Sequence, residues 1–366
     1  MTVPPIAPDA RLHLRPVQLI DTPVALDGQA ERLAGGMQWF AAYELLAPGL
    51  RATVPLTDFP RLLESVSSAE AERLQTLHAR ITAPRTPIAC GARVLRLDQP
   101  LVAGILNCTP DSFSDGGRNG SDPEAIAATG HRMAEAGAAL IDVGGESTRP
   151  GAATVWEGDE IARVVPVIER LAASGTPVSI DTRKAAVMEA ALAAGAHIVN
   201  DVAALLFDPR ALEVVACAGC PVVLMHSPDP ATGGHARPGY RNVLTDVFDW
   251  LDQRIEAVVA GGVDRASILV DPGIGFGKSL AENLALVNGL AVFHGLGCPI
   301  LLGASRKRLI GALANEAPAD QRLGGSLTLA LKGAEMGAQL IRAHDVPETV
   351  QALRVWRGLR DTALAG

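Results

Sequence analysis

Short apolar stretches, each ending in polar residues, alternate with alanine- and leucine-rich segments between Leu101 and Val346. The eight stretches read LVAGILN, LIDVGGESTR, VSIDT, IVND, VVLMH, ILVDPGIGFGKS, ILLGASRK and LIRAHD. An apolar run of roughly four to eight residues is typical of a buried strand in a parallel sheet. The segments between the runs have the spacing of amphipathic helices. Eight strands that alternate with helices predict an α/β protein, a (β/α)₈ or TIM barrel.

The pattern also predicts where each unit begins and ends. We expect strands over 101–107, 139–144, 177–181, 197–201, 221–226, 267–271, 299–304 and 339–343. We expect helices over 123–137, 159–174, 184–195, 209–219, 243–261, 280–296, 320–337 and 347–363, with a short helical turn at 306–314. Gly-Ala pairs that begin at Gly137, Gly195 and Gly337 stand where a helix should end and the next strand begin. This repeated joint supports the barrel independently of the strands.

The residues with chemical potential fall where the predicted strands end. In a barrel of this kind the active site lies at the carboxyl ends of the strands. The polar residues at these ends are Asn107, Asp142, Arg149, Asp181, Asn200, His226, Asp271, Lys307, Arg342 and His344. The sequence therefore predicts one polar rim that carries the chemistry.

The first 84 residues differ from the rest and are expected to form a small N-terminal α/β extension, with the barrel over residues 85–366. RLHLRPVQLI and GGMQWFAAYELLA have the pattern of two strands, or of one strand and one helix. TDFPRLLESV and SAEAERLQTLHARI are expected to be helices, and TAPRTP a linker. CGARVLRLDQP is expected to be a short strand or hairpin that closes the bottom of the barrel. The role of the extension does not follow from its sequence.

Composition narrows the partners of the protein. The net charge of the 366 residues is -8 and the sequence pI is about 5.5, so no general nucleic-acid surface is expected. No apolar run approaches the ~20 residues that span a bilayer. The N-terminus also lacks the features of a signal peptide, so we expect a cytoplasmic protein. The five cysteines are too few and scattered for a disulfide framework, and Cys217-Ala-Gly-Cys220 lacks a second ligand pair for zinc.

The segment from Gly273 to Ser279, GIGFGKS, superficially resembles a phosphate-binding loop. The spacing excludes that motif, because its first glycine would fall at Pro272. A glycine-rich βα loop whose backbone approaches a planar ligand is the better interpretation. In this interpretation the side chain of Lys278 is exposed.

Six blocks of residues are similar to the motifs of the dihydropteroate synthase family, in the family's order. They are Asn107–Gly117, Asp142–Gly151, Ser179–Thr182, Asp271–Phe276, Ser305–Lys307 and Arg342–Asp345. The resemblance extends over about Pro87 to Leu364. It implies a transferase of folate biosynthesis that joins p-aminobenzoate to 6-hydroxymethyl-7,8-dihydropterin pyrophosphate and releases pyrophosphate. Such enzymes are targets of sulfonamides.

The resemblance assigns a pterin pocket to residues whose chemistry suits an amino-pyrimidinone ring. A buried polar edge of such a ring needs matched donors and acceptors, because each unpaired group costs ~1–3 kcal/mol. Carboxylates accept from ring N–H groups, an amide both donates and accepts, and a lysine donates to a ring carbonyl or nitrogen. The implied substrate-binding residues are Asp142, Asp181, Asn200, Met225, Asp271, Phe276 and Lys307.

The pyrophosphate needs cations and hydrogen-bond donors. Arg342 and His344 are separated by one residue on the last strand, so both side chains point the same way. The resemblance adds Thr148 and Arg149 for the phosphates, and Asn107 as a protein ligand of a Mg²⁺ ion bound to the pyrophosphate. The catalytic group is thus Asn107, Arg149, Lys307, Arg342 and His344. Phe113 and Pro150, on two glycine-rich loops, are expected to line the p-aminobenzoate pocket.

One departure from the family concerns the carboxylate of p-aminobenzoate. A serine often follows the lysine of the Ser-Arg-Lys motif, and Arg308 stands there in this chain. Either Arg308 binds the carboxylate, or the backbone N–H groups of the following helix do so alone. Arg306 of the same motif is either a ligand or part of a structural ion pair.

Two other functions are compatible with parts of the pattern. A pterin-binding methyltransferase shares the barrel and the acidic pterin contacts but binds no pyrophosphate, so the Arg149, Lys307 and Arg342 blocks argue against it. A non-catalytic pterin-binding or scaffold protein would not need polar residues at every strand end. The resemblance also implies a homodimer.

Overall fold

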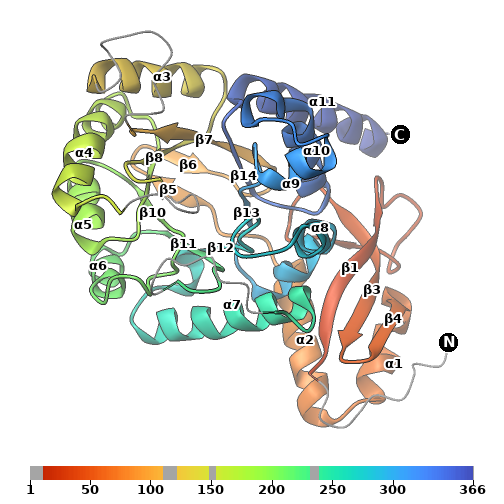
Figure 1. Cartoon of the computed structure of the whole chain (residues 1–366). Coiled ribbons are helices and arrows are strands. Elements are labelled where there is room, and N and C mark those ends of the chain that lie inside the picture. Colours follow the sequence, from red (N-terminus) through yellow and green to blue (C-terminus); the bar gives the residue numbers. More distant parts are fainter. Residues whose placement is uncertain (1–10, 110–121, 148–153, 231–238, 366) are drawn as a thin grey trace.

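The computed structural model describes residues 11–109, 122–147, 154–230 and 239–365. Its centre is an eight-stranded parallel sheet in the order β12-β11-β10-β9-β8-β7-β14-β13 (Figure 1). A bridge between Val270 and Ile300 joins the two ends of this order and closes the barrel. The strands are β7 (Leu101–Asn107), β8 (Leu140–Gly144), β9 (Val178–Asp181), β10 (Ile198–Asp201), β11 (Val222–Met225), β12 (Ile268–Asp271), β13 (Leu301–Leu302) and β14 (Leu340–Ala343). The predicted TIM barrel is confirmed.

Helices surround the barrel on the outside and alternate with the strands along the chain (Figure 1). They are α3 (Pro123–Glu135), α4 (Glu157–Ala173), α5 (Ala185–Ala193), α6 (Ala211–Ala218), α7 (Val243–Ala260), α8 (Leu280–Asn288), α9 (Arg308–Leu313), α10 (Leu323–Glu335) and α11 (Val346–Ala365). Within the described residues, 3₁₀ segments add to them: η3 (Arg265–Ser267), η4 (Leu290–Leu296) and η5 (Ala319–Gln321). The predicted joints are confirmed, because Gly137, Gly195 and Gly337 all adopt positive φ angles of 110°, 105° and 84°.

The bottom of the barrel is closed by a hairpin, as the sequence predicts. Its strands β5 (Ile88–Cys90) and β6 (Arg93–Leu95) pair in antiparallel fashion. Ile88, Cys90 and Leu95 are buried against one inward residue from most barrel strands, among them Leu140, Ile198 and Leu340. This plug fills the amino-terminal end of the barrel, so the opposite end is left for ligands.

The N-terminal residues form an antiparallel sheet with helices on one side. Its strands are β1 (His13–Ile20), β2 (Glu31–Arg32), β3 (Trp39–Ala47) and β4 (Leu50–Pro55), followed by η1 (Leu56–Asp58), α1 (Phe59–Glu64) and α2 (Ser68–Thr82). The segment GGMQWFAAYELLA is therefore a strand, the first of the two predicted alternatives. Ser67 caps α2 by accepting from the backbone N–H of Glu70. We call residues 11–82 the N-terminal unit.

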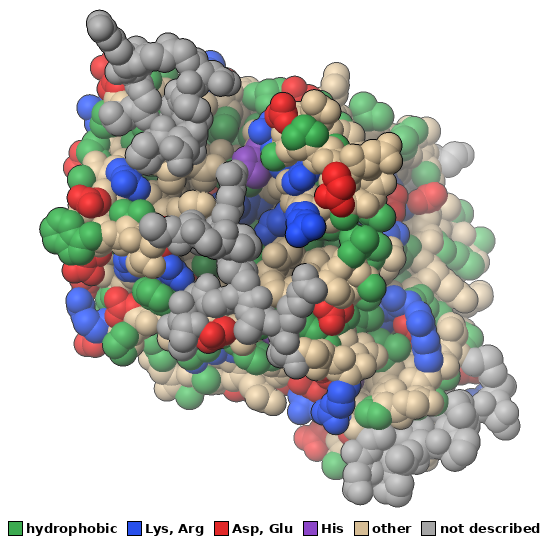
Figure 2. Space-filling view, viewed as in Figure 1, with side chains coloured by type: hydrophobic (Ala, Val, Ile, Leu, Met, Phe, Trp, Pro, Cys, Tyr) green, Lys and Arg blue, Asp and Glu red, His purple; other side chains and the backbone are tan. Residues whose placement is uncertain are grey.

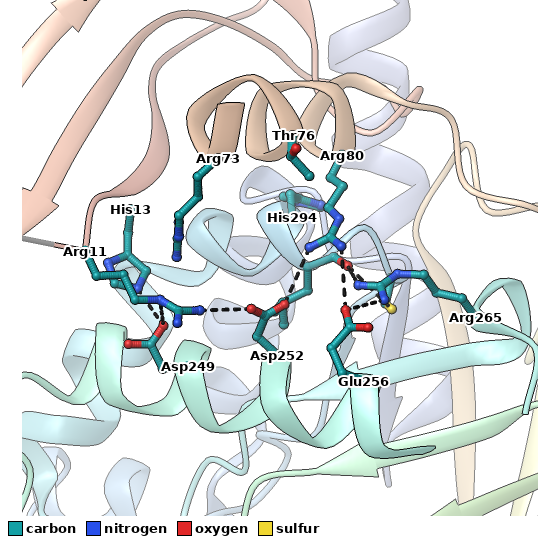
Figure 3. A network of polar contacts seen from close by, with 12 residues as sticks. Arg11, His13, Arg73, Thr76, Arg80, Asp249, Asp252, Glu256, Arg265 and His294 are labelled. Carbon is teal, nitrogen blue, oxygen red and sulfur yellow. Dashed lines mark hydrogen bonds and ion pairs between the residues drawn. The ribbon is translucent and has the colours of Figure 1, made fainter. Parts of the chain in front are cut away.

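The N-terminal unit packs on the barrel through both apolar and charged groups. Leu77 of α2 lies beside Gly295 of η4 and Phe248 of α7, and the buried ring of His13 packs edge-on against Phe248 at 5.2 Å. Figure 3 shows three carboxylates of α7 pointing toward arginines of the N-terminal unit. The pairs are Arg11–Asp249 at 2.9 Å, Arg11–Asp252 at 3.0 Å, Arg80–Asp252 at 3.5 Å and Arg80–Glu256 at 3.7 Å. One hydrophobic core runs through both parts.

Candidate active site

The carboxyl ends of the barrel strands meet at one rim, and those predicted polar residues that the structure describes lie there. Asn107 ends β7, Asp181 ends β9, and both are paired in register with Gly144 at the end of β8. On the face seen in Figure 2, Lys and Arg side chains gather near the centre, with a histidine beside them. The rim therefore offers cations above a floor of carboxylates.

A hydrogen-bonded network occupies the floor of the rim. The carboxylate of Asp142 accepts from Ser179 Oγ at 2.5 Å, from Asn200 Nδ2 at 3.1 Å and from Arg342 Nε at 2.5 Å. Arg342 also donates from a terminal nitrogen to Asp181 Oδ2 at 2.7 Å. Both oxygens of Asp142 thus have protein partners, and Arg342 bridges two carboxylates from different strands. These contacts use two of the five N–H donors of Arg342 and leave three for a ligand.

Asp181 is the member of this network with spare bonding capacity. Its side chain is 13% exposed, and Oδ1 is buried without a hydrogen-bond partner among the described residues. Burial is the main cause that raises the pKa of Asp181 to about 7; Arg342 opposes this shift and the nearby Asp142 contributes to it. A buried carboxylate oxygen without a donor is costly, so this position is suited to a ligand N–H group.

A second group lies across the rim from Asp181. Met225 and Asp271 end neighbouring strands in register, and both are buried. Lys307 Nζ lies 4.2 Å from the centroid of the Phe276 ring and donates to the carbonyl of Ile274 at 2.7 Å. Burial lowers the pKa of Lys307 to about 8, while the nearby Asp271 favours its charged form. An apolar ring face, a thioether, a carboxylate and an ammonium are therefore placed at this side of the rim, and their chemistry suits a pterin.

The expectation that Lys278 is exposed was wrong. Its side chain is 6% exposed, and Nζ donates to the carbonyls of Gly273 at 2.8 Å and Phe276 at 3.2 Å and to Nδ1 of His226 at 3.0 Å. These acceptors replace water around the ammonium, which is why a lysine is tolerated there. Sequence reasoning considered the lysine of GIGFGKS only in relation to the phosphate-loop motif. It missed that a lysine five residues after Gly273 can fold back onto the carbonyls of the same loop.

Residues near the last two strands complete the described rim. Nδ1 of His344 lies 3.0 Å from Ser305 Oγ, and this hydroxyl also accepts from the backbone N–H of His344. Arg306 forms an ion pair with Asp345, with Nε at 3.0 Å from Oδ2, which confirms the structural alternative for this residue. Arg308 is exposed at the first residue of α9. Sequence reasoning missed the anchoring roles of Ser179 and Ser305, although both lie within the recognised motifs.

Four of the predicted site residues, Phe113, Thr148, Arg149 and Pro150, lie outside the described residues. Among those described, no cluster of three or more His, Cys, Asp or Glu side chains is suited to a metal ion. Asn107, half-buried at the end of β7, offers a single amide oxygen. This donor set fits a Mg²⁺ ion that is carried mainly by phosphate oxygens and water, and it does not fit a protein-held metal centre.

Comparison with known proteins places this site in a family. The family described as pterin binding enzyme matches residues 103–344, which is most of the barrel. Dihydropteroate synthase of Escherichia coli (strain K12) is 45% identical over 262 residues, covering 71% of this chain and 92% of the relative. Dihydropteroate synthase of Bacillus subtilis (strain 168) is 42% identical over 261 residues, covering 70% and 88%.

Solved structures agree. Xanthomonas albilineans dihydropteroate synthase with 4-aminobenzoic acid has a TM-score of 0.70 and 49% identity, covering 75% of this chain and 98% of that one. The same enzyme in complex with 7,8-dihydropteroate has a TM-score of 0.68 and 46% identity, covering 75% and 99%. The barrel rim carries the described members of the predicted site, and the family match and the relatives extend over most of the barrel. The chain therefore belongs to the dihydropteroate synthase family of pterin-binding enzymes.

Proposed function

We infer that this chain is a transferase of folate biosynthesis. It joins p-aminobenzoate to 6-hydroxymethyl-7,8-dihydropterin pyrophosphate and gives 7,8-dihydropteroate and pyrophosphate. Related structures hold 4-aminobenzoic acid and 7,8-dihydropteroate, which are one substrate and the product of this reaction. The observation that carries the inference is the buried, unpartnered Oδ1 of Asp181, which lies beside a cation and faces the Phe276–Lys307 group across the rim.

The described residues suit the recognition of a pterin ring. Asp181 and Asp271 accept from ring N–H groups, and Lys307 donates to a ring carbonyl or nitrogen. The amide of Asn200 can both donate and accept. Met225 and Phe276 cover apolar ring faces. Asp142, whose oxygens are both occupied, anchors Arg342 and Asn200 from behind rather than offering a free acceptor.

The reaction breaks the bond between the pterin methylene carbon and a pyrophosphate oxygen, and forms a bond from that carbon to the amine of p-aminobenzoate. The amine loses one proton as it bonds. The amine is already neutral near pH 7, so no general base is essential. Stabilisation of the leaving pyrophosphate by Arg342, Lys307 and His344, together with Arg149, therefore contributes most to the rate.

We propose that Mg²⁺ accompanies the pyrophosphate and that Asn107 supplies one oxygen to it. The ion would neutralise charge on the leaving group when bound. We also propose that Phe113, Pro150 and Thr148 line the substrate pocket beside Arg149, and that the enzyme is a cytoplasmic homodimer. None of the described helices is long and apolar enough to cross a bilayer.

The experiment that tests the function mixes the purified chain with both substrates and Mg²⁺. We expect equal amounts of pyrophosphate and 7,8-dihydropteroate, and inhibition by a sulfonamide that is relieved by p-aminobenzoate. A related structure from Yersinia pestis holds a sulfonamide drug complex. A pterin-binding methyltransferase or a non-catalytic scaffold would release no pyrophosphate, and that result would overturn the inference.

A further inference from the structure

The ammonium of Lys278 is buried, and each of its protons has an acceptor. Lys278 lies in the loop after β12, and its side chain folds back toward the strand ends. Its Nζ lies 2.8 Å from the Gly273 carbonyl, 3.2 Å from the Phe276 carbonyl and 3.0 Å from His226 Nδ1. An ammonium has three donors and no acceptor. A saturated, buried ammonium of this kind holds its acceptors in fixed relative positions.

The contact with Lys278 also fixes the state of His226. Burial lowers the pKa of Lys278 to about 7. In its charged form the ammonium only donates, so Nδ1 of His226 must accept, and its proton is on Nε2. The imidazole is 4% exposed and packs edge-on against Trp250 at 5.0 Å. Burial, with Lys278 as the next cause, lowers the pKa of His226 to about 3. His226 is therefore a neutral acceptor at the end of β11 and not a proton donor to Lys278.

The segment that Lys278 holds is a turn with little rigidity of its own. Gly273, Gly275 and Gly277 have φ angles of 72°, 83° and 59°, which side chains rarely adopt. A Cβ on Gly273 would lie 1.9 Å from the carbonyl oxygen of His226, so the turn is pressed against the end of β11. Besides Lys278, the N–H of Gly275 donates to Asn283 Oδ1 at 2.6 Å, so side chains from outside the turn supply much of its support.

The other side of this turn carries the groups that face the pterin space. The carbonyl of Ile274 accepts from Lys307 Nζ, the ring of Phe276 lies under the same ammonium, and the backbone N–H of Gly273 donates to Asp271 Oδ1 at 2.7 Å. Lys278 and Lys307 thus both donate to carbonyls of the turn, from opposite sides. Only Lys307 lies where a ligand can touch it.

We propose that Lys278 is a positioning residue for pterin binding: with His226 as its partner it fixes the glycine turn 273–277, so that Phe276 and Lys307 stand ready for the pterin ring. Lys278 itself does not touch the substrate. This proposal rests on the proposed function and adds to it a residue that acts through the turn.

The test is Lys278→Met, which keeps the length of the side chain and removes its donors. We expect KM for the pterin pyrophosphate to rise about 10-fold or more, as loss of bonds from a charged donor predicts. KM for p-aminobenzoate should change less than about twofold, because the residues proposed for that substrate, Phe113, Pro150 and Arg308, lie on other segments. Lys332→Met, on α10 away from the rim and 35% exposed, is the matched control and should change neither constant.

The partner residue provides a second, independent variant. The side-chain oxygen of Asn can occupy the position of Nδ1, whereas Leu offers no acceptor there. We therefore expect His226→Leu to raise KM for the pterin pyrophosphate as Lys278→Met does, and His226→Asn to raise it several-fold less. The melting temperatures of all variants are measured alongside the kinetics.

The outcomes separate this proposal from the proposed function. If the wild-type chain forms no 7,8-dihydropteroate, the proposed function fails whatever Lys278 does. If the wild type is active and Lys278→Met leaves KM for the pterin pyrophosphate unchanged, the positioning role is wrong. An equal rise of both KM values, with a lower melting temperature, would also overturn it, because that is the result of a merely structural lysine.

Discussion

The guanidinium of Arg342 lies between two carboxylates that reach the rim from different strands. The arrangement is stable without a ligand because opposite charges offset the cost of burial, and Asp142 raises the pKa of Arg342 although burial alone would lower it. Asp181 has only one oxygen committed to this pair. A ligand donor can therefore bind Asp181 without displacing Arg342.

The first prediction concerns the protonation of Asp181, whose pKa burial raises to about 7. Its carboxylate accepts from the pterin only when ionised, so kcat/KM should fall as the pH drops below about 7. The groups around it are Arg342, Asp142, Glu160 and Asp201. Asp181→Asn should reduce transition-state stabilisation, calculated from kcat/KM at pH 8, by ~2–3 kcal/mol, the cost of a lost charge-assisted bond. It should also remove the fall of kcat/KM below about pH 7.

Stability gives a check that does not depend on catalysis. The folded chain binds the proton of Asp181 more tightly than the unfolded chain, since the pKa rises from 3.8 to about 7 on folding. The contribution of this group to the free energy of unfolding must therefore decrease as pH rises through that window and level off above it. An Asp181→Asn chain that keeps the wild-type pH dependence, either of the free energy of unfolding or of kcat/KM, would contradict the assignment.

The second prediction concerns Arg308, the departure from the family motif. It is exposed at the start of α9 and directly follows Lys307. If its guanidinium meets the carboxylate of p-aminobenzoate, Arg308→Ser should raise KM for p-aminobenzoate and weaken its dependence on salt, while KM for the pterin pyrophosphate stays constant. Unchanged KM for p-aminobenzoate would assign the contact to backbone N–H groups alone.

At the scale of elements, the order and type of the barrel units follow from the sequence, and their lengths do not. The strand expected over 299–304 is only Leu301–Leu302, because the N–H of Ile300 donates to the side chain of Gln339 instead of a strand. The helix expected over 280–296 is divided at Gly289 into α8 and η4. Apolar periodicity detects burial, and it does not detect a side chain that replaces a backbone partner.

Long-range polar partners are the part of the site that periodicity cannot predict. Glu146 of the second motif block and Lys184, just beyond the third, are 38 positions apart. Lys184 Nζ nevertheless pairs with Glu146 and, at 2.6 Å, with Glu160 of α4. Thr182 also donates to Glu160 at 2.8 Å. This buried network joins the ends of β8 and β9 to α4, and its members are identified only when the strands are placed side by side.

The third prediction follows from this network. Lys184→Met would leave the buried carboxylate of Glu160 without its cation, and Glu146 with Arg183 as its remaining cation. We expect a loss of ~3–5 kcal/mol in the free energy of unfolding, measured by urea denaturation. Arg210→Ala is the matched control, because Arg210 and Glu189 form an exposed pair with side chains 57% and 47% exposed. The control should lose much less, because solvent and salt screen an exposed pair. Equal losses in both variants would contradict a stabilising role for burial of the pair.

At the scale of the whole molecule, the N-terminal unit and the barrel share a single core. The sequence predicts a boundary near residue 84, and in the structure α2 ends at Thr82 and β5 begins at Ile88. The linker between them is nevertheless anchored, because Arg85 is buried and donates to the carbonyl of His294 in η4 at 3.1 Å. Pattern reasoning separates the two parts because it follows the chain, whereas the apolar joint forms between distant segments.

The last prediction is that the two parts unfold together. Leu62 of α1 is fully buried inside the N-terminal unit, so Leu62→Ala should cost ~2–5 kcal/mol through the cavity that it leaves. Because Leu77, Phe248 and the charged pairs of Figure 3 couple the unit to α7, this loss should reach the barrel. Calorimetry should show one transition at a lower temperature, and the midpoint of thermal inactivation of the enzyme should fall by the same amount. Two transitions, with inactivation of the enzyme unchanged in Leu62→Ala, would show instead that the N-terminal unit is an independent domain.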